Sequence, residues 1–238
     1  IVLPESSALQ DTVVRHRRHK DVYANPLTVL QKAMDVETGP DGAVPEPDLR
    51  LRLAALMHDI GKPATRRFMP DGTVTFHAHD YVGARMTAKR MRALHFDKQT
   101  IKDVSRLVEL HLRFHGYADS PWSDSAVRRY VTDAGPLLAR LGCLTRADVT
   151  TGNRRKAAML SHAYDDLERR IEALRQQEEL ASIRPELDGQ EIMAELGIKP
   201  GPEVGKAYKF LLDLRMERGP IGKELAREAL HSWWATQQ

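Results

Sequence analysis

The stretch Leu53-Ala54-Ala55-Leu56-Met57-His58-Asp59-Ile60-Gly61-Lys62-Pro63 decides how this chain folds around its chemistry. An apolar helical run ends in an adjacent His-Asp pair, and Gly61 and Pro63 then stop the helix. A buried carboxylate beside an imidazole is costly unless both groups find partners. A divalent cation would satisfy both, and the negative end of the helix dipole favours a cation there. The alternative is that Asp59 caps the helix, or pairs with Lys62 or an arginine at the surface.

Further histidines and an aspartate could join this pair. His79 opens a predicted helix, His111 and His115 lie one turn apart on the next, and Asp148 ends an apolar helical stretch. Neutral imidazoles and carboxylates are ligands for Mg, Mn, Ni, Fe or Zn ions. Leu112 stands where a zincin helix needs Glu, so that motif is excluded. Four histidines are expected at the surface rather than among the metal ligands: His77, His95, His115 and His162.

Apolar spacing elsewhere predicts an all-α fold with one small β-hairpin. Apolar positions at three- and four-residue steps predict helices over 27–36, 48–60, 79–94, 98–114, 124–133, 136–147, 153–180, 189–196, 203–218 and 221–235. Asp97 is the expected N-cap of the helix over 98–114. The strands Arg67–Met69 and Thr73–Phe76 flank a Pro-Asp-Gly turn and predict the hairpin. The break at 184–189 predicts a helical body over 1–183 and a small helical tail over 184–238.

Composition narrows the class of protein. The chain has 238 residues, with Lys+Arg 36 against Asp+Glu 33, and the resulting charge of +3 permits a nucleic-acid partner without requiring one. One cysteine, Cys143, excludes an internal disulfide. No apolar run reaches the roughly 18 residues of a membrane span, so we expect a cytoplasmic protein without a membrane partner. The first residue is Ile1, and we expect a processed or truncated piece of a longer chain.

The order of these residues resembles the HD superfamily of metal-dependent phosphohydrolases, and longer motifs resemble one branch of it. That branch is the C-terminal half of actinobacterial-type CCA-adding tRNA nucleotidyltransferases. The motifs that carry the resemblance cover almost the whole chain: His19-Lys20-Asp21-Val22-Tyr23, the His58-to-Pro63 run, Leu110-His111-Leu112-Arg113-Phe114-His115, Arg146-Ala147-Asp148, Ile183-to-Gly189 and Gly197-to-Gly205.

The resemblance implies an HD-type body that holds a divalent metal ion and a tail that contacts tRNA. The metal ligands that it implies are His58, Asp59 and Asp148, completed by His79, His111 and position 25. It also implies that Asp59, Lys62 and Arg66 act on a phosphate substrate, with Lys62 or Arg66 neutralising its charge. The expected activity is hydrolysis of phosphomonoesters or 2′,3′-cyclic phosphates, on nucleotides or on the 3′ ends of tRNA and other RNA.

Two departures from the family pattern bear on this activity. Asn25 stands where the family has its first histidine, and an amide oxygen binds transition metals less well than imidazole does. We therefore expect Asn25→His to tighten metal binding. The sequence also holds no Gly-Gly and no Asp-x-Asp, which the nucleotidyltransferase head needs for its magnesium ions. We expect no nucleotide addition by this chain alone.

The sequence is compatible with three functions. The first is a metal-dependent phosphohydrolase, the second is a non-catalytic tRNA-binding body with a decayed metal site, and the third is a stand-alone nucleotide phosphohydrolase. Basic residues that could face RNA phosphates gather in four clusters: Arg15 to Lys20, Lys62 to Arg67, Arg85 to Arg92, and Arg154 to Lys156. An ordinary solvated surface explains any one cluster equally well. The sequence does not indicate the oligomeric state.

Overall fold

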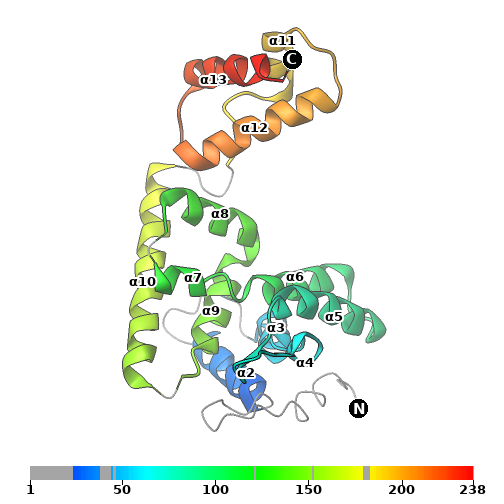
Figure 1. Ribbon diagram of the computed structural model, residues 1–238, viewed down its shortest axis with the longest axis vertical. Coiled ribbons are helices and arrows are strands. Elements are labelled where there is room, and N and C mark those ends of the chain that lie inside the picture. The colour runs from blue at the N-terminus through cyan, green and yellow to red at the C-terminus, as the bar shows by residue number, and fades with distance from the viewer. Residues whose placement is uncertain are drawn as a thin grey trace. The chain divides into compact units, whose positions relative to one another are not determined.

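The computed structural model describes residues 24–37, 44, 47–120, 122–151, 153–178 and 183–237. In these residues the architecture is helical with one two-stranded antiparallel hairpin, so the predicted all-α class is confirmed. Figure 1 labels the elements along the chain. Among the helices in this part of the chain, none is both long enough and apolar enough to cross a membrane.

The helices follow the predicted order, with ends shifted by a few residues. The first are α2 (Ala24–Glu37), α3 (Leu49–Met57), α4 (Lys62–Thr65), α5 (His79–Ala93), α6 (Lys98–Leu110) and α7 (His115–Asp119). Next come α8 (Asp124–Ala134), the 3-10 turn η1 (Gly135–Leu137), α9 (Leu138–Asp148) and α10 (Arg154–Gln177). The last are α11 (Gly189–Leu196), α12 (Pro202–Arg218) and α13 (Lys223–Ala235). The short helices α4 and α7 were not predicted.

Two helices stop earlier than their apolar spacing predicts, and a histidine stands at each stop. The prediction over 98–114 overshoots, because α6 ends at Leu110 and His115 begins α7. His111 and His115 therefore do not share a helix. His111 Nδ1 donates to the Val108 carbonyl at 2.6 Å, which satisfies the oxygen that a continuing helix would pair with residue 112. His58 ends α3 in the same way, through the Ala55 carbonyl at 2.8 Å.

The hairpin joins β1 (Arg67–Phe68) to β2 (Val74–Thr75), in the register Arg67 opposite Thr75 and Phe68 opposite Val74. The Asp71 carboxylate closes the turn by accepting from the Thr73 amide at 2.9 Å and from its hydroxyl at 2.7 Å. Gly72 has a φ of +81°, a conformation that glycine adopts without strain. The predicted strands are thus present, each shorter than expected.

The described residues form two compact units. The first takes those up to Ser120 together with Pro136–Asp165, and the second takes those from Trp122 to Gly135 together with those from Asp166 onward. The helix α10 therefore contributes to both. The predicted division into a body over 1–183 and a tail over 184–238 stays a prediction.

The core of the first unit lies where α2, α3, α5, α6 and α9 pack on one another. Its fully buried apolar side chains come mainly from three of these helices: Leu51, Ala54 and Ala55 on α3, Val104, Leu107 and Val108 on α6, and Leu141 and Leu144 on α9. Asp48 fixes the start of α3, since its carboxylate accepts from the Leu51 amide at 2.8 Å. Arg140 Nη2 on α9 lies 2.7 Å from the same carboxylate, so the two helices begin side by side.

The second unit has its own core between α11, α12 and α13. Leu187, Ile192, Ala207, Leu211, Ala226 and Leu230 are buried there, and the rings of Phe210 and Trp233 stack with centroids 4.9 Å apart. These side chains pack as core residues rather than as platforms for bases. Tyr208 on α12 is 37% exposed.

Candidate metal centre

Five buried or half-buried side chains of the first unit lie together, and we call them the His/Asp cluster: His58, Asp59, His79, His111 and Asp148. His58 follows the last residue of α3, His111 follows the last residue of α6, and Asp148 is the last residue of α9. The C-terminal ends of three helices thus meet at one point. Each carries the negative end of a helix dipole, so the backbone itself favours a cation there.

Gly61 brings the fourth helix to the cluster. A β-carbon on Gly61 would lie 2.2 Å from the His79 carbonyl oxygen and 2.7 Å from the Gly83 amide nitrogen. The turn after Asp59 can therefore rest against the first turn of α5 only if residue 61 has no side chain. This contact places His79, the first residue of α5, beside Asp59.

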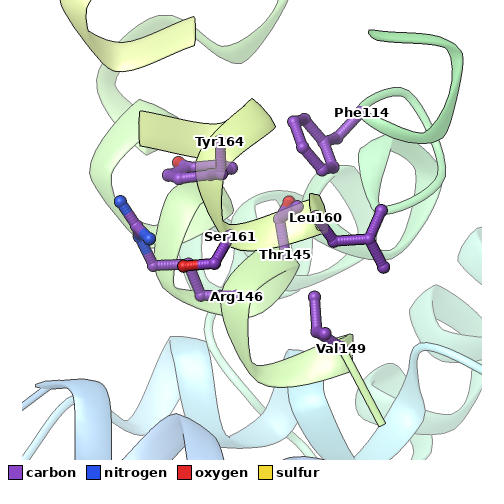
Figure 2. Close-up of a pocket in the computed structure, with 7 residues that line it drawn as sticks. All are labelled: Phe114, Thr145, Arg146, Val149, Leu160, Ser161 and Tyr164. Atoms are coloured by element: carbon purple, nitrogen blue, oxygen red, sulfur yellow. The ribbon is translucent and has the colours of Figure 1, made fainter. Parts of the chain in front are cut away.

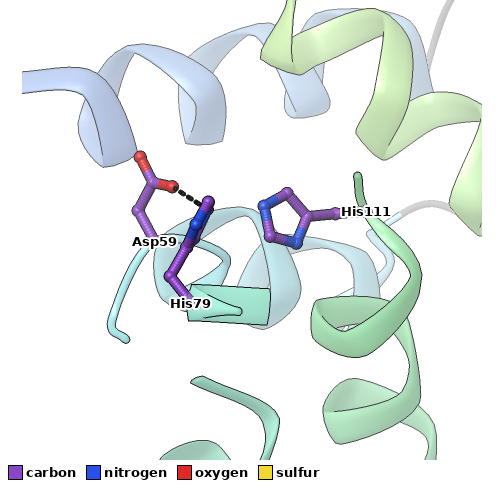
Figure 3. Close-up of side chains that lie close together, drawn as sticks. All are labelled: Asp59, His79 and His111. Carbon is purple, nitrogen blue, oxygen red and sulfur yellow. Dashed lines mark ion pairs between the residues drawn. The ribbon is translucent and has the colours of Figure 1, made fainter. Parts of the chain in front are cut away.

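The side chains of the cluster lie close enough together to surround one common point. His58 Nε2 lies 3.3 Å from Asp59 Oδ2 and 3.4 Å from Asp148 Oδ1, and His79 Nε2 lies 3.4 Å from Asp59 Oδ1. Figure 3 shows Asp59, His79 and His111, whose ligand atoms all lie within 4.8 Å of one another. The three residues are buried. A metal ion could be reached from all of them without a change in the backbone.

The hydrogen bonds of the imidazoles fix their tautomers. The Nδ1 atoms of His58, His79 and His111 bond to the carbonyl oxygens of Ala55, Phe76 and Val108 at 2.8, 2.8 and 2.6 Å. A carbonyl only accepts, so each Nδ1 carries a proton and each Nε2 offers a lone pair when the ring is neutral. Within the described part of the chain, these Nε2 atoms make no hydrogen bond of regular geometry, and those of His58 and His79 lie at ion-pair distance from the carboxylates of Asp59 and Asp148. This arrangement is typical of histidines that bind metal ions.

The charged groups of the cluster shift one another's pKa values. Burial lowers the pKa of His58, but the carboxylates of Asp59 and Asp148 outweigh burial and raise the pKa to about 10. Burial, reinforced by the charge of His58, lowers the pKa of His111 to about 4. Burial raises the pKa of Asp59, yet His58, His79 and Lys62 hold that pKa well below its usual range. Two buried carboxylates thus stay ionised and attract a cation.

Lys62 also contacts the cluster. Its Nζ lies 2.6 Å from Asp59 Oδ2, and its side chain is 22% exposed. This ion pair is the surface alternative that the sequence left open for Asp59, although here Asp59 itself is buried. The pairing and the metal ligation are compatible, because Asp59 Oδ1 faces His79 instead.

The other residues that the sequence singles out have the following positions in the structure. The guanidinium of Arg66 lies 5.4 Å from the centroid of the Phe68 ring, on the hairpin. Asn25 lies in α2, but its side chain falls outside the described residues, as does the basic cluster from Arg15 to Lys20. The four histidines expected at the surface are all exposed: His77, His95, His115 and His162. Sequence reasoning missed the role of Gly61, because its backbone angles are ordinary and only the packing reveals the need for glycine.

One protein family and two curated proteins are similar to this chain. Residues 22–153 match the family model described as the HD domain. The chain is 39% identical over 193 residues to the CC-adding tRNA nucleotidyltransferase of Thermus thermophilus, which covers 79% of this chain and 41% of that protein. It is 32% identical over 240 residues to the A-adding tRNA nucleotidyltransferase of Deinococcus radiodurans, which covers 100% of this chain and 52% of that protein. The chain spans about half the length of these curated relatives. Its assignment to an actinobacterial type stays a prediction.

Proposed function

The chain belongs to the HD-domain family, and from this premise we propose that its His/Asp cluster binds a divalent metal ion and hydrolyses phosphate esters of nucleotides or RNA 3′ ends. One observation carries the proposal. Three imidazoles in the interior have committed their Nδ1 protons to the backbone, and the Nε2 atoms of two of them, His58 and His79, lie 3.3 to 3.4 Å from the carboxylates of Asp59 and Asp148. Buried polar atoms are rarely left unpaired, and a metal ion would pair all of these at once.

Each residue of the cluster has a role in this proposal. His58, Asp59 and Asp148 are the first ligands, and His79 and His111 complete the site or hold a second ion. A bound divalent ion would lower the pKa of a water and polarise the phosphoryl group. Lys62 has a flexible stem and three donors, so its ammonium can turn from Asp59 to a substrate phosphate. Arg66, four residues further along the chain, is the second candidate for that role.

The substrate class rests on the relatives. Both are named as tRNA nucleotidyltransferases, one CC-adding and the other A-adding. We therefore propose tRNA or another RNA 3′ end as the partner, a terminal or cyclic phosphate as the reacting group, and residues 184–238 as a tRNA-contact region. The mixture of carboxylate and imidazole donors suits Mn, Ni, Fe or Zn better than a site built only of oxygen would, and it still accepts Mg.

Metal titration with matched variants tests the proposal. We expect the metal-free protein to bind Mn²⁺ or Ni²⁺ in calorimetry and then to hydrolyse adenosine 2′,3′-cyclic phosphate and p-nitrophenyl phosphate. Asp59→Asn should abolish both metal binding and hydrolysis while circular dichroism shows an intact fold. His162→Ala, which alters an exposed histidine on α10, should change neither. Equal metal affinity in Asp59→Asn and the parent protein would contradict the proposed site.

A second candidate function is a non-catalytic tRNA-binding body. The observation that favours it is Asn25, which stands where the resemblance places a histidine ligand. The same experiment separates the two, because a decayed site would bind tRNA but neither retain metal at millimolar concentration nor hydrolyse either substrate. Hydrolysis of nucleotides without any affinity for tRNA would instead indicate a stand-alone nucleotide phosphohydrolase.

A further inference from the structure

The β-hairpin of the first unit presents an exposed aromatic ring among basic side chains. Phe68 on β1 is 62% exposed, the largest fraction for a large apolar side chain in the described part of the chain. Met69, the next residue, is 44% exposed. Single exposed apolar side chains are common on protein surfaces. The exposure of Phe68 therefore indicates a partner only together with the charges around it.

The charges around Phe68 are mainly positive. The Arg66 guanidinium lies 5.4 Å from the centroid of the ring, as expected for side chains two residues apart on an extended backbone. Arg67, between them, is exposed as well. From residue 62 to residue 75 the chain carries three basic side chains and one acidic side chain, that of Asp71, which closes the hairpin turn. The hairpin therefore attracts a polyanion.

The ring of Phe68 is open to a stacking partner. A guanidinium covers at most one side of a ring, and the exposed fraction of Phe68 shows that the other side is accessible. The pocket in Figure 2 is different, because the Phe114 and Tyr164 rings that line it are 2% and 5% exposed. The Arg146 guanidinium also lies 4.2 Å from the centroid of the Tyr164 ring. A planar group can thus stack on the hairpin without any rearrangement of the core, whereas those buried rings offer no free side.

Contacts at the base of the hairpin connect it to the His/Asp cluster. The carbonyl of Phe76, which follows β2 directly, accepts from His79 Nδ1 at 2.8 Å. The Lys62 ammonium lies 5.9 Å from the centroid of the Phe76 ring and 2.6 Å from Asp59 Oδ2. One ligand of the cluster therefore bonds to the backbone of Phe76, and the lysine that pairs with another ligand faces its ring.

The register of the hairpin gives the separation between Phe68 and the cluster. Phe68 lies opposite Val74, and Val74 is two residues, or roughly 7 Å of strand, from Phe76. Phe68 is thus about one strand repeat farther from the cluster than Phe76 is. An extended nucleotide strand whose terminal phosphate lies at the cluster can place one of its last bases on Phe68.

We propose that the hairpin binds the unpaired end of a single-stranded RNA, with a base stacked on Phe68 and the adjoining phosphates held by Arg66 and Lys62. This rests on the proposed function for the position of the terminal phosphate at the His/Asp cluster, and it makes the substrate a strand rather than a free nucleotide. Aromatic rings beside cations bind single strands with little sequence preference, because every base has a flat face. The bases of a duplex stay paired and stacked on one another, so a duplex gains less from the ring.

RNA binding without turnover tests the hairpin separately from hydrolysis. In EDTA and at low salt, a short fluorescein-labelled single-stranded RNA is titrated with the whole chain, and its anisotropy reports binding. We expect Phe68→Ala to weaken binding about tenfold, or ~1.4 kcal/mol, which lies within the range for one stacked base. Phe68→Trp should bind at least as tightly as the parent protein. Phe68→Leu, which is apolar but has no ring, should bind as weakly as Phe68→Ala. Circular dichroism should show all three variants folded, because Phe68 is exposed.

A strand with abasic sugars at its 3′ end separates stacking from phosphate contacts. It carries the same phosphates without the terminal bases, so the parent protein should bind it about tenfold more weakly than the intact strand. Phe68→Ala should alter that weaker binding little. Leu49→Ala is the matched control, since Leu49 is 56% exposed but begins α3, whereas the cluster lies at the end of that helix. This variant should bind both strands as the parent protein does.

Equal affinity of Phe68→Ala and the parent protein for the intact strand would overturn the proposal, and so would full affinity in Phe68→Leu. A dimer in sedimentation that Phe68→Ala dissociates would also overturn it, because the ring would then belong to an interface between copies of the chain. If adenosine 2′,3′-cyclic phosphate is hydrolysed but RNA binding does not depend on Phe68, the hairpin is not the RNA site and the proposed function stands. If Phe68→Ala weakens RNA binding but no substrate is hydrolysed with added metal, the proposed function fails and the RNA-binding hairpin stands.

Discussion

The ammonium of Lys62 lies 2.6 Å from Asp59 Oδ2, and this single contact has opposite consequences for a metal ion and for a phosphate. Two positive charges about 4 Å apart repel by several kcal/mol near a protein surface, but the half-buried side chain of Lys62 can move and water partly screens its charge. We therefore expect Lys62→Gln to tighten Mn²⁺ binding only about threefold, or ~0.7 kcal/mol. The same change should weaken inhibition by inorganic phosphate. Calorimetry and phosphate inhibition measure the two effects.

A lysine elsewhere in the first unit provides the control for this change. Lys102 on α6 is exposed, and Lys102→Gln removes the same charge away from the His/Asp cluster. It should leave both quantities unaltered. Weaker metal binding in Lys62→Gln would mean that the ammonium orients Asp59 rather than competing for it.

The sequence predicted the members of the cluster better than their hydrogen bonds. His58 and Asp59 were identified because an apolar helix ends in polar groups, and burial follows from that pattern. The bond from His58 Nδ1 to the Ala55 carbonyl could not be predicted, because it depends on a ring rotamer and not on residue spacing.

At the scale of elements, the approach of α5 to the turn after Asp59 depends on Gly61. A methyl group there would meet the His79 carbonyl at 2.2 Å, so Gly61→Ala must push the first turn of α5 away. We expect a loss of about 1–3 kcal/mol in the free energy of unfolding, as for other overpacked sites. Metal affinity should fall by more than about tenfold (~1.4 kcal/mol), since His79 would leave Asp59. Urea denaturation and metal titration measure the two losses.

Gly205 offers the comparison. It is a helical glycine on α12 with nothing within 4 Å of its β-carbon position. Gly205→Ala should raise stability by up to roughly 1 kcal/mol through helix propensity and leave metal binding unchanged. A neutral effect of Gly61→Ala on metal affinity would show that the close backbone contact does not position His79.

The elements of the second unit are joined by a buried ion cluster. Glu178 accepts from Arg128 Nη2 of α8 at 2.9 Å and from Arg215 Nη1 of α12 at 2.8 Å, and it is 8% exposed. Burial raises the pKa of Glu178, but the hydrogen bonds from Arg128 and Arg215 outweigh burial and lower the pKa. A lowered pKa in the folded state means that the stabilisation is present above pH 4.5 and is lost as the pH falls through the folded pKa.

Glu178→Gln should therefore destabilise the second unit near pH 7 by about 2–4 kcal/mol, because two buried arginines lose their counter-ion. The difference from the parent protein should shrink as the pH falls below 4.5. Urea denaturation at several pH values measures it. Glu217→Gln, which alters the exposed partner of Arg129, should cost less than about 1 kcal/mol. A pH-independent difference for Glu178→Gln would contradict the ionised cluster.

Element boundaries show where spacing alone fails. The apolar pattern continues to Phe114, which is 2% exposed, so periodicity predicts a longer helix than α6. The helix stops because a side chain satisfies its carbonyl, and apolar spacing does not register that bond. By contrast, the N-cap at Asp97 was predicted correctly, since its carboxylate accepts from the Thr100 amide at 2.9 Å.

At the scale of the whole molecule, the proposed tRNA partner should bind through exposed basic residues. Arg85, Lys89 and Arg92 lie at four- and three-residue steps along α5, and all three are exposed. Neutralising about five phosphates would give a log–log salt slope near roughly −4. Arg85→Glu combined with Lys89→Glu should make that slope less negative by about 1.5. Arg169→Glu, a change beside Asp166, should not alter the slope. An affinity that does not depend on salt would argue against a phosphate-binding face.

The apolar pattern could not predict which helices meet. Periodicity predicts that α3, α6 and α9 each bury a face, but it does not say that their last turns converge. The resemblance to the HD superfamily supplied the order of ligands, and the packing of these helices supplied the place.

The spread of the cluster along the chain has a consequence for protein synthesis. Asp59 is translated long before Asp148, and at about 5–20 residues per second the ~90 intervening residues take roughly 5 to 20 s. A nascent chain therefore exposes Asp59 before the rest of the site exists. Lys62 leaves the ribosome almost together with Asp59, its ion-pair partner in the folded unit. Because Asp148 is the last residue of α9, the five side chains of the His/Asp cluster can come together only after α9 has been made.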